Sequence, residues 1–256
     1  MPAPPPASDA PPRFRRVTLA TSQMAEEQQW WTGRLGFDTA PGAPAGGFAV
    51  RVGNGVLAFA PVPDGARTRG ARPSHHVALE VAEDRLVEAS EWLARASPLV
   101  ALRDGETIVD FPNWVAHSVY ALSPGGHVVE LIARHRRPWE PWTPATMSPE
   151  EVRGPGLVRG ISEVGIHAPD VGALVDRLAG LGERLWWGDP QDGFAAVGDE
   201  SGLFICVREW RPWFPTDKAA APGPIAIELT RVPGLTPGEP VPLGSAVELK
   251  AVGGGD

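Results

Sequence analysis

The stretch from His75 to Arg134 decides how the chain folds, and its parts are HHVALEV (75–81), DRLVEASEWLARA (84–96) and HVVELIAR (127–134). Apolar residues alternate in the first and last parts, which predicts two strands, because successive strand side chains point to opposite faces. The middle part predicts a helix. We expect the wholly apolar face of each strand to pack under this helix. His76 and Glu130 fall on the opposite, mixed faces, where they would line a concavity.

The composition limits which binding partners and which cellular compartment are expected. The 256 residues carry a net charge of −8 and are 43% hydrophobic, which suffices for one large or two small domains. The acidic balance, without a dense Lys/Arg cluster, argues against nucleic acid, and no apolar segment is long enough to cross a membrane. The single cysteine, Cys206, permits no intramolecular disulfide. The opening MPAPPPASDAPP lacks the pattern of a secretory signal, so we predict a cytoplasmic protein.

A strand, helix and hairpin pattern recurs along the chain, which indicates an internal repeat. The copies comprise a strand at 14–21, a helix at 22–37 and a hairpin at 48–62, and later a strand at 160–168, a helix at 169–182 and a hairpin at 194–210. Two further segments, PIAIELT (224–230) and AVELKAV (246–252), repeat only the opening and closing strands. We infer four modules, of which the last is reduced.

The repeat indicates an α+β fold of tandem modules, the last of them degenerate. The predicted division of the chain is a disordered proline-rich tail at 1–12, a two-module domain at 13–135, a proline-rich linker at 136–157 and a second, degenerate domain at 158–254.

The order of elements, with HHVAL (75–79) at its start and SPGGHVVEL (123–131) at its end, resembles one module of the vicinal oxygen chelate superfamily. That superfamily includes glyoxalase I, extradiol dioxygenases, and fosfomycin- and bleomycin-resistance proteins. The family resemblance carried by residues 75–131 implies that these are paired βαβββ modules, with a degenerate second pair. It also implies two modules around a cup, with a metal held by a His in a first strand and a Glu in a last strand. His76 and Glu130 match these positions, and a divalent iron, manganese or zinc ion would suit them.

The other ligand positions of the family do not match. Aligning RRVTL (15–19) with HHVAL places Arg16 where a ligand is expected, and Ala58 takes the last-strand position. A guanidinium stays protonated and does not bind a metal, so His117 or His75 would have to complete the site. The corresponding positions of the second domain are Glu163, Pro224, Glu248 and a residue near Ile205. Because this set contains no His, we expect no metal there.

The candidate substrate contacts are Arg16, Thr18, Trp114, His117 and Tyr120. The first two share the mixed face of the first strand, and Trp114 follows a proline in a loop that could form a rim. His117 and Tyr120 lie on opposite faces of one strand, so at most one of them lines the cup. By contrast, Trp186 and Trp187 are expected in the core or an interface, and EWRPWFPT (209–216) is expected to form a structural strap or a lid.

Two functions remain open at this point. One is a metal-dependent lyase or ring-cleaving dioxygenase that uses His76 and Glu130. The other is a metal-free binding protein in which Arg16 neutralises Glu130, since a buried carboxylate needs a counter-charge. The expected partner is a small-molecule substrate or ligand, and a homodimer is left open.

Overall fold

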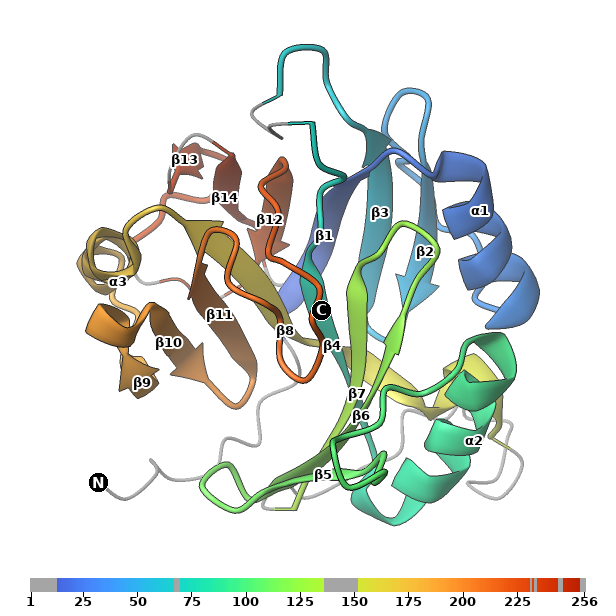
Figure 1. Ribbon diagram of the computed structural model, residues 1–256. Coiled ribbons are helices and arrows are strands. Elements are labelled where there is room, and N and C mark those ends of the chain that lie inside the picture. The colour runs from blue at the N-terminus through green and yellow to red at the C-terminus, as the bar shows by residue number, and fades with distance from the viewer. Residues whose placement is uncertain are drawn as a thin grey trace.

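The computed structural model describes residues 13–66, 70–135, 152–230, 232, 234–243 and 246–253. The predicted tail at 1–12 and most of the predicted linker, residues 136–151, lie outside this description. The described chain contains the four modules expected from the repeat, and the first three each bring a helix against a group of strands (Figure 1).

Each module begins with a strand that is followed, in the first three, by a helix. The first module comprises β1 (Phe14–Thr21), α1 (Met24–Gln28) with a π-helical continuation η1 (Gln29–Arg34), β2 (Phe48–Val52) and β3 (Gly55–Pro61). The second comprises β4 (His76–Val81), η2 (Glu83–Arg85), α2 (Leu86–Ala96), β5 (Val109–Phe111), β6 (Ala116–Leu122) and β7 (Val128–Arg134). The third comprises η4 (Gly154–Leu157), β8 (Val158–Ala168), α3 (Val171–Gly180), β9 (Leu185–Asp189), η5 (Pro190–Asp192), β10 (Phe194–Asp199) and β11 (Gly202–Arg208). The fourth comprises β12 (Ile225–Leu229), β13 (Pro240–Pro242) and β14 (Val247–Ala251).

The first and last strands of every module are neighbours in the sheet. The last strand lies parallel to the first, in the pairs β1–β3, β4–β7, β8–β11 and β12–β14. Parallel neighbours require a crossover connection, and helices supply it in the first three modules. The fourth module has no helix in the part of it that the structure describes, so the predicted reduction to its outer strands is confirmed, with the short β13 added.

The α+β class and the paired βαβββ modules are confirmed, but the partners within the pairs differ from the expected tandem order. β4 pairs antiparallel with β8, and β1 pairs antiparallel with β12. The second module therefore joins the third, and the first joins the fourth. These ladders run between the ranges 13–135 and 158–254, so neither range closes a pair by itself. The alternation of apolar and polar residues along a strand identifies the face that is buried. It does not identify the strand of another module that pairs with the open edge of that strand.

The core lies between the sheet and the helices, as the apolar strand faces predicted. Val77, Leu79 and Val81 are buried in one large cluster with Trp30 and Trp31. The helices are also linked directly to each other. The Trp30 indole N–H donates to the carbonyl of Ala96 at the end of α2. The concave face of the sheet between the second and third modules is thereby left for the site.

Candidate metal centre and pocket

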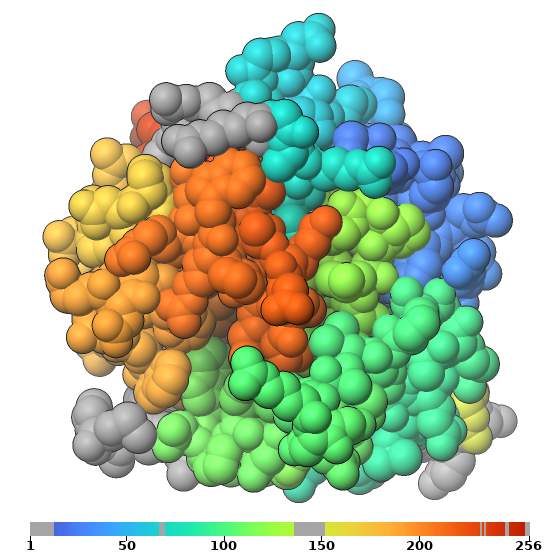
Figure 2. Space-filling model, viewed as in Figure 1, coloured from blue at the N-terminus to red at the C-terminus, as the bar shows by residue number. Residues whose placement is uncertain are grey.

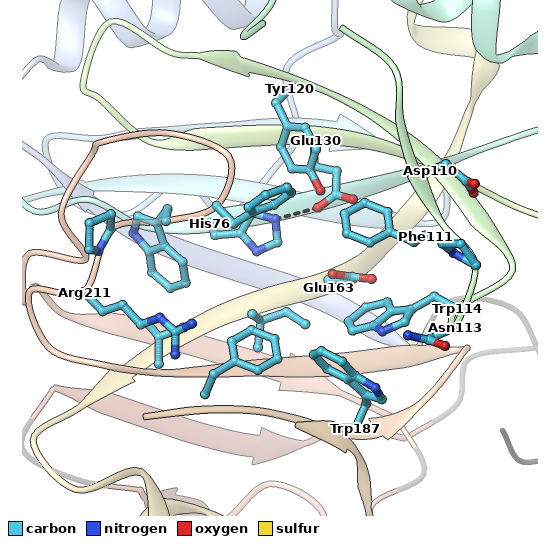
Figure 3. Close-up of a pocket in the computed structure, with 17 residues that line it drawn as sticks. His76, Asp110, Phe111, Asn113, Trp114, Tyr120, Glu130, Glu163, Trp187 and Arg211 are labelled. Atoms are coloured by element: carbon cyan, nitrogen blue, oxygen red, sulfur yellow. Dashed lines mark hydrogen bonds and ion pairs between the residues drawn. The ribbon is translucent and has the colours of Figure 1, made fainter. Parts of the chain in front are cut away.

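Three ligand-type side chains meet on the concave face where the second and third modules join. His76 opens β4, Glu130 lies on β7 and Glu163 on β8, and all three are buried. One ligand atom from each lies within 4.8 Å of the others. The His76 Nε2 and Glu130 Oε2 atoms are 2.8 Å apart (Figure 3). The strand register explains why these side chains meet. Ala78 on β4 is the partner of Glu130 on β7 and also of Glu163 on β8.

Glu163 was expected in a metal-free second domain, and the structure corrects that expectation. The antiparallel ladder between β4 and β8 brings it to the centre formed by His76 and Glu130. The signal was present in the sequence, since Glu163 occupies in its module the position that His76 occupies in the second. It could not be used without knowing that these two modules are partners. The fourth equivalent position belongs to Ile205, which pairs with Gly165 and lines the pocket as an apolar residue.

Burial and charge repulsion dominate the electrostatics of the centre. Burial, together with the nearby Glu130 carboxylate, raises the pKa of Glu163 to about 7, although the Arg134 guanidinium opposes this rise. Arg134 is fully buried and forms an ion pair with Glu163. Tyr120 is the strand partner of Glu130, and burial, together with the nearby Glu130 and Glu163 carboxylates, holds the pKa of its phenol well above the ordinary value. The carboxyl groups of Glu130 and Glu163 therefore share a buried site that a cation would stabilise.

The centre forms the floor of a pocket of about 450 Å³. Its walls come from the β5–β6 hairpin, the β9–β10 hairpin and the connection between β11 and β12. The lining residues are His76, Asp110, Phe111, Pro112, Asn113, Trp114, Tyr120, Glu130, Glu163, Trp187, Phe194, Ile205, Val207, Arg211, Pro212, Trp213 and Phe214. In Figure 2 the orange part of the surface, around residues 200–220, lies between the third module and the green second module.

The strap at 209–216 is anchored to the rest of the fold and also lines the pocket. Trp213 is buried and anchors the strap, because its indole N–H donates to the carbonyl of Ser74 at 3.0 Å and its ring lies 5.7 Å from the His76 ring. Gly165 makes room for this ring, since a Cβ atom there would lie 2.5 Å from Trp213. The neighbouring Arg211 and Phe214 line the pocket. The strap is therefore both a structural anchor and a wall of the site.

The predicted contact residues divide into two groups. Trp114 and Tyr120 line the pocket, and His117 does not. His117 instead makes a 2.5 Å hydrogen bond to His135 on the other side of β6, which agrees with its opposite orientation to Tyr120. Trp187 was expected in the core or an interface, and it lies on the edge strand β9, where it lines the pocket and is 37% exposed.

Arg16 and Thr18 lie outside this pocket because β1 belongs to the other module pair. The guanidinium of Arg16 donates to the carbonyls of Pro41 and Gly42. The expected ion pair between Arg16 and Glu130 is therefore absent. Register places Arg16, Ala58, Ala226 and Lys250 at the positions of the first and fourth modules that correspond to the ligand positions of the centre. The sequence alignment, which gave Pro224 and Glu248, was displaced by two residues.

His75 does not complete the centre either. Its ring stacks between His127, at a centroid distance of 5.3 Å, and His167, at 5.6 Å. Burial lowers the pKa of His127 to about 3 and that of His167 to about 4. Glu27, whose carboxylate lies 3.9 Å from His127 Nε2, has its pKa raised to about 7, also by burial. These groups form a second buried titratable cluster, and their imidazoles are neutral at pH 7.

No protein-family model and no protein with a curated description matches the sequence. Solved structures do match in fold. A Bacillus subtilis protein described as a "putative dioxygenase" gives a TM-score of 0.56 at 15% identity, over 86% of this chain and 71% of that chain. A mutant of glyoxalase I from Zea mays gives 0.50 at 14% identity, over 93% of both chains.

These similarities show that the chain shares the fold of these two proteins, which is the fold that the resemblance seen in the sequence implied. Within that fold, His76, Glu130 and Glu163 form a group that could hold a metal ion. None of the helices in the described part of the chain is long and apolar enough to cross a membrane.

Proposed function

We propose that the protein is a metal-dependent enzyme of the glyoxalase or dioxygenase type, with His76, Glu130 and Glu163 as ligands of one divalent ion. The observation that carries this proposal is the convergence of three buried ligand atoms within 4.8 Å at the floor of a pocket. The donor set also fits, because one imidazole and two carboxylates suit iron, manganese and zinc.

The surrounding residues have clear roles in this proposal. Tyr120 lies beside Glu130 as its strand partner, and Arg134 holds Glu163 through the buried ion pair. Such outer contacts fix the geometry of ligands. The bound ion would supply Lewis-acid polarisation of substrate oxygens. Ile205 cannot coordinate, so coordination positions would stay free for two oxygens of a small substrate.

A second function is favoured by the charge pairs themselves. If His76 is protonated, it balances Glu130, while Arg134 balances Glu163. The centre would then be neutral without an ion, and the pocket would serve a metal-free binding protein. In this alternative Arg134 has the role that the sequence assigned to Arg16.

Elemental analysis of protein purified without chelators tests the proposal. We expect close to one equivalent of iron, manganese or zinc in the wild type, and loss of this metal in His76→Ala and in Glu163→Gln. His117→Ala is the matched control, because His117 belongs to the same module but lies outside the pocket. Circular dichroism establishes that each variant is folded. Metal retained in both centre variants, or a wild type that stays metal-free after incubation with each ion, would refute the metalloenzyme.

A further inference from the structure

The walls of the pocket are unusually aromatic. Seven lining residues are Phe, Tyr or Trp, and they come from three separate segments of the chain: Phe111, Trp114, Tyr120, Trp187, Phe194, Trp213 and Phe214. They meet each other mostly edge to face, as in the pairs Trp114–Trp187 at 6.3 Å and Trp187–Phe194 at 5.7 Å. Edge-to-face contact leaves ring faces available for a further ring, which aromatic side chains bind with geometric preference.

Two of these rings lie at the mouth and remain accessible. Phe214 is 57% exposed and Trp187 is 37% exposed, although both are large and apolar. Phe214 lies 5.9 Å from Phe111 and 6.2 Å from Tyr120, so it bridges the strap and the second module across the opening. Exposed aromatic side chains that adjoin a pocket are a mark of a ligand site, because a bound ligand covers them.

Arg211 gives the pocket a charge preference. It is the only Lys or Arg among the lining residues, and its guanidinium lies 5.4 Å from the centre of the Phe194 ring. One N–H donates to the carbonyl of Asp192 at 3.1 Å. Within the described parts of the chain, no carboxylate forms an ion pair with it. Figure 3 shows Arg211 across the pocket from Asp110 and Asn113, with the centre between them.

The guanidinium of Arg211 indicates an anionic ligand, because the rest of the pocket is acidic. The chain carries a net charge of −8, and the floor of the pocket holds the Glu130 and Glu163 carboxyl groups. An anion would be repelled from such a site unless a cation received it. A guanidinium held over an aromatic face presents its remaining N–H groups in a planar fork that matches a carboxylate.

We propose that the pocket binds a planar aromatic monoanion, namely an aryl carboxylate of one or two rings. The rings lie among Trp114, Trp187 and Phe214, and the carboxylate pairs with Arg211. A volume of about 450 Å³ accommodates a molecule of this size. The inference extends the proposed function to a class of substrate. It rests on that function only where it assumes that further oxygens of the substrate face the metal centre.

Calorimetric titration with three simple probes tests the inference. The probes are 1-naphthoate, the neutral isostere 1-naphthalenemethanol and the non-aromatic cyclohexanecarboxylate, each titrated into chelator-treated and metal-loaded protein. We expect 1-naphthoate to bind the wild type most tightly in both forms. Arg211→Gln should weaken 1-naphthoate by about tenfold, the scale of one charge-assisted hydrogen bond, and leave the alcohol unchanged. Trp187→Ala should weaken both aromatic probes and affect cyclohexanecarboxylate less.

Arg208→Gln is the matched control for Arg211. Arg208 is also exposed and donates to a carbonyl of the same turn, that of Gln191 at 3.2 Å, but it does not line the pocket. Equal binding of 1-naphthoate and its alcohol to the wild type, equal losses in the two arginine variants, or no binding of any probe at millimolar concentration would overturn the inference. The metal measurement is read separately. Anion preference in a protein that takes up no metal would leave this inference standing and reject the proposed function, whereas metal uptake without anion preference would do the reverse.

Discussion

Glu163 on β8 is the register partner of Ala78 on β4, and this single pairing brings a third ligand-type side chain to the side of His76. One residue of displacement along the ladder would turn Glu163 to the other face of the sheet, because strand side chains alternate. The centre therefore depends on the contact between the second and third modules.

Arg134 should stabilise the fold through its buried ion pair with Glu163. Arg134→Met leaves a buried carboxylate uncompensated, at a cost of about 3–5 kcal/mol in the free energy of unfolding. Adding Glu163→Gln should restore part of this loss in a urea double-mutant cycle.

A divalent ion should substitute for the lost Arg134 charge, so saturating metal should recover part of the stability of Arg134→Met. Arg13→Met is the control, because Arg13 forms a comparable buried pair with Glu183 away from the centre, with a shortest N–O distance of 2.5 Å. Equal responses of the two variants to metal would contradict this account.

Arg16 should have little influence on stability and none on the centre. Its guanidinium donates to two backbone carbonyls at an exposed position, and it does not contact Glu130. We expect Arg16→Ala to lower the free energy of unfolding by less than about 1 kcal/mol, the usual scale for exposed pairs. Coupling between Arg16→Ala and Glu130→Gln should be near zero in a double-mutant cycle, and strong coupling would revive the binding-protein model based on Arg16.

The buried cluster of Glu27, His127 and His167 should shape the dependence of stability on pH. The two imidazoles have lowered pKa values, so their contribution is lost as the pH falls below about 6.5. Glu27 acts in the opposite direction. Because its pKa is raised to about 7, the native state binds the proton more tightly, and this contribution is lost as the pH rises from about 4.5 to 7.

Glu27→Gln should therefore make acid destabilisation steeper. Between pH 7 and pH 5 we expect the variant to lose more unfolding free energy than the wild type, by an amount on the order of 1 kcal/mol or more. Urea midpoints measured at several pH values give the two slopes. A variant slope equal to or shallower than that of the wild type would show that Glu27 is ionised in the native state at pH 7 and below.

Gly165→Ala should disturb the strap. The added Cβ would lie 2.5 Å from the Trp213 ring and 2.8 Å from the His76 Cβ, both in a buried site. Overpacking of this kind costs about 1–3 kcal/mol, and it should also displace Trp213 from the pocket wall. Gly180→Ala is the control, since nothing lies within 4 Å of a Cβ at that position. Unfolding free energies and the fluorescence of the tryptophans report both effects, which the control should not show.

Much of the fold was predictable from alternation alone. The faces of β4 and β7 follow from period two, and this placed His76 and Glu130 correctly on the concave side. The loop position of Trp114 predicted a place at the pocket rim, and alternation predicted that at most one of His117 and Tyr120 lines the cup, without saying which. These predictions succeeded because each depends on residues that are close in sequence or within one module.

The remaining parts of the site depend on contacts between distant segments. Glu163 and Arg134 meet because of the partner choice between modules, which no local pattern encodes. Trp187 resembles a core residue by composition, and only the edge position of β9 exposes it. Arg211 was visible within a strap of aromatic and proline residues, but its direction depends on the anchoring of Trp213 at Ser74.

The pairing of β1 with β12 has a consequence for synthesis on the ribosome. Phe14 pairs with Leu229, more than 200 residues later in the chain. At a synthesis rate of about 5–20 residues per second, one edge of β1 waits on the order of ten seconds or more for its partner. An open strand edge invites pairing with other chains, and charged side chains discourage it. Arg15 and Arg16 lie on this strand, so Arg16, which lies outside the candidate metal centre, would protect the nascent chain from aggregation.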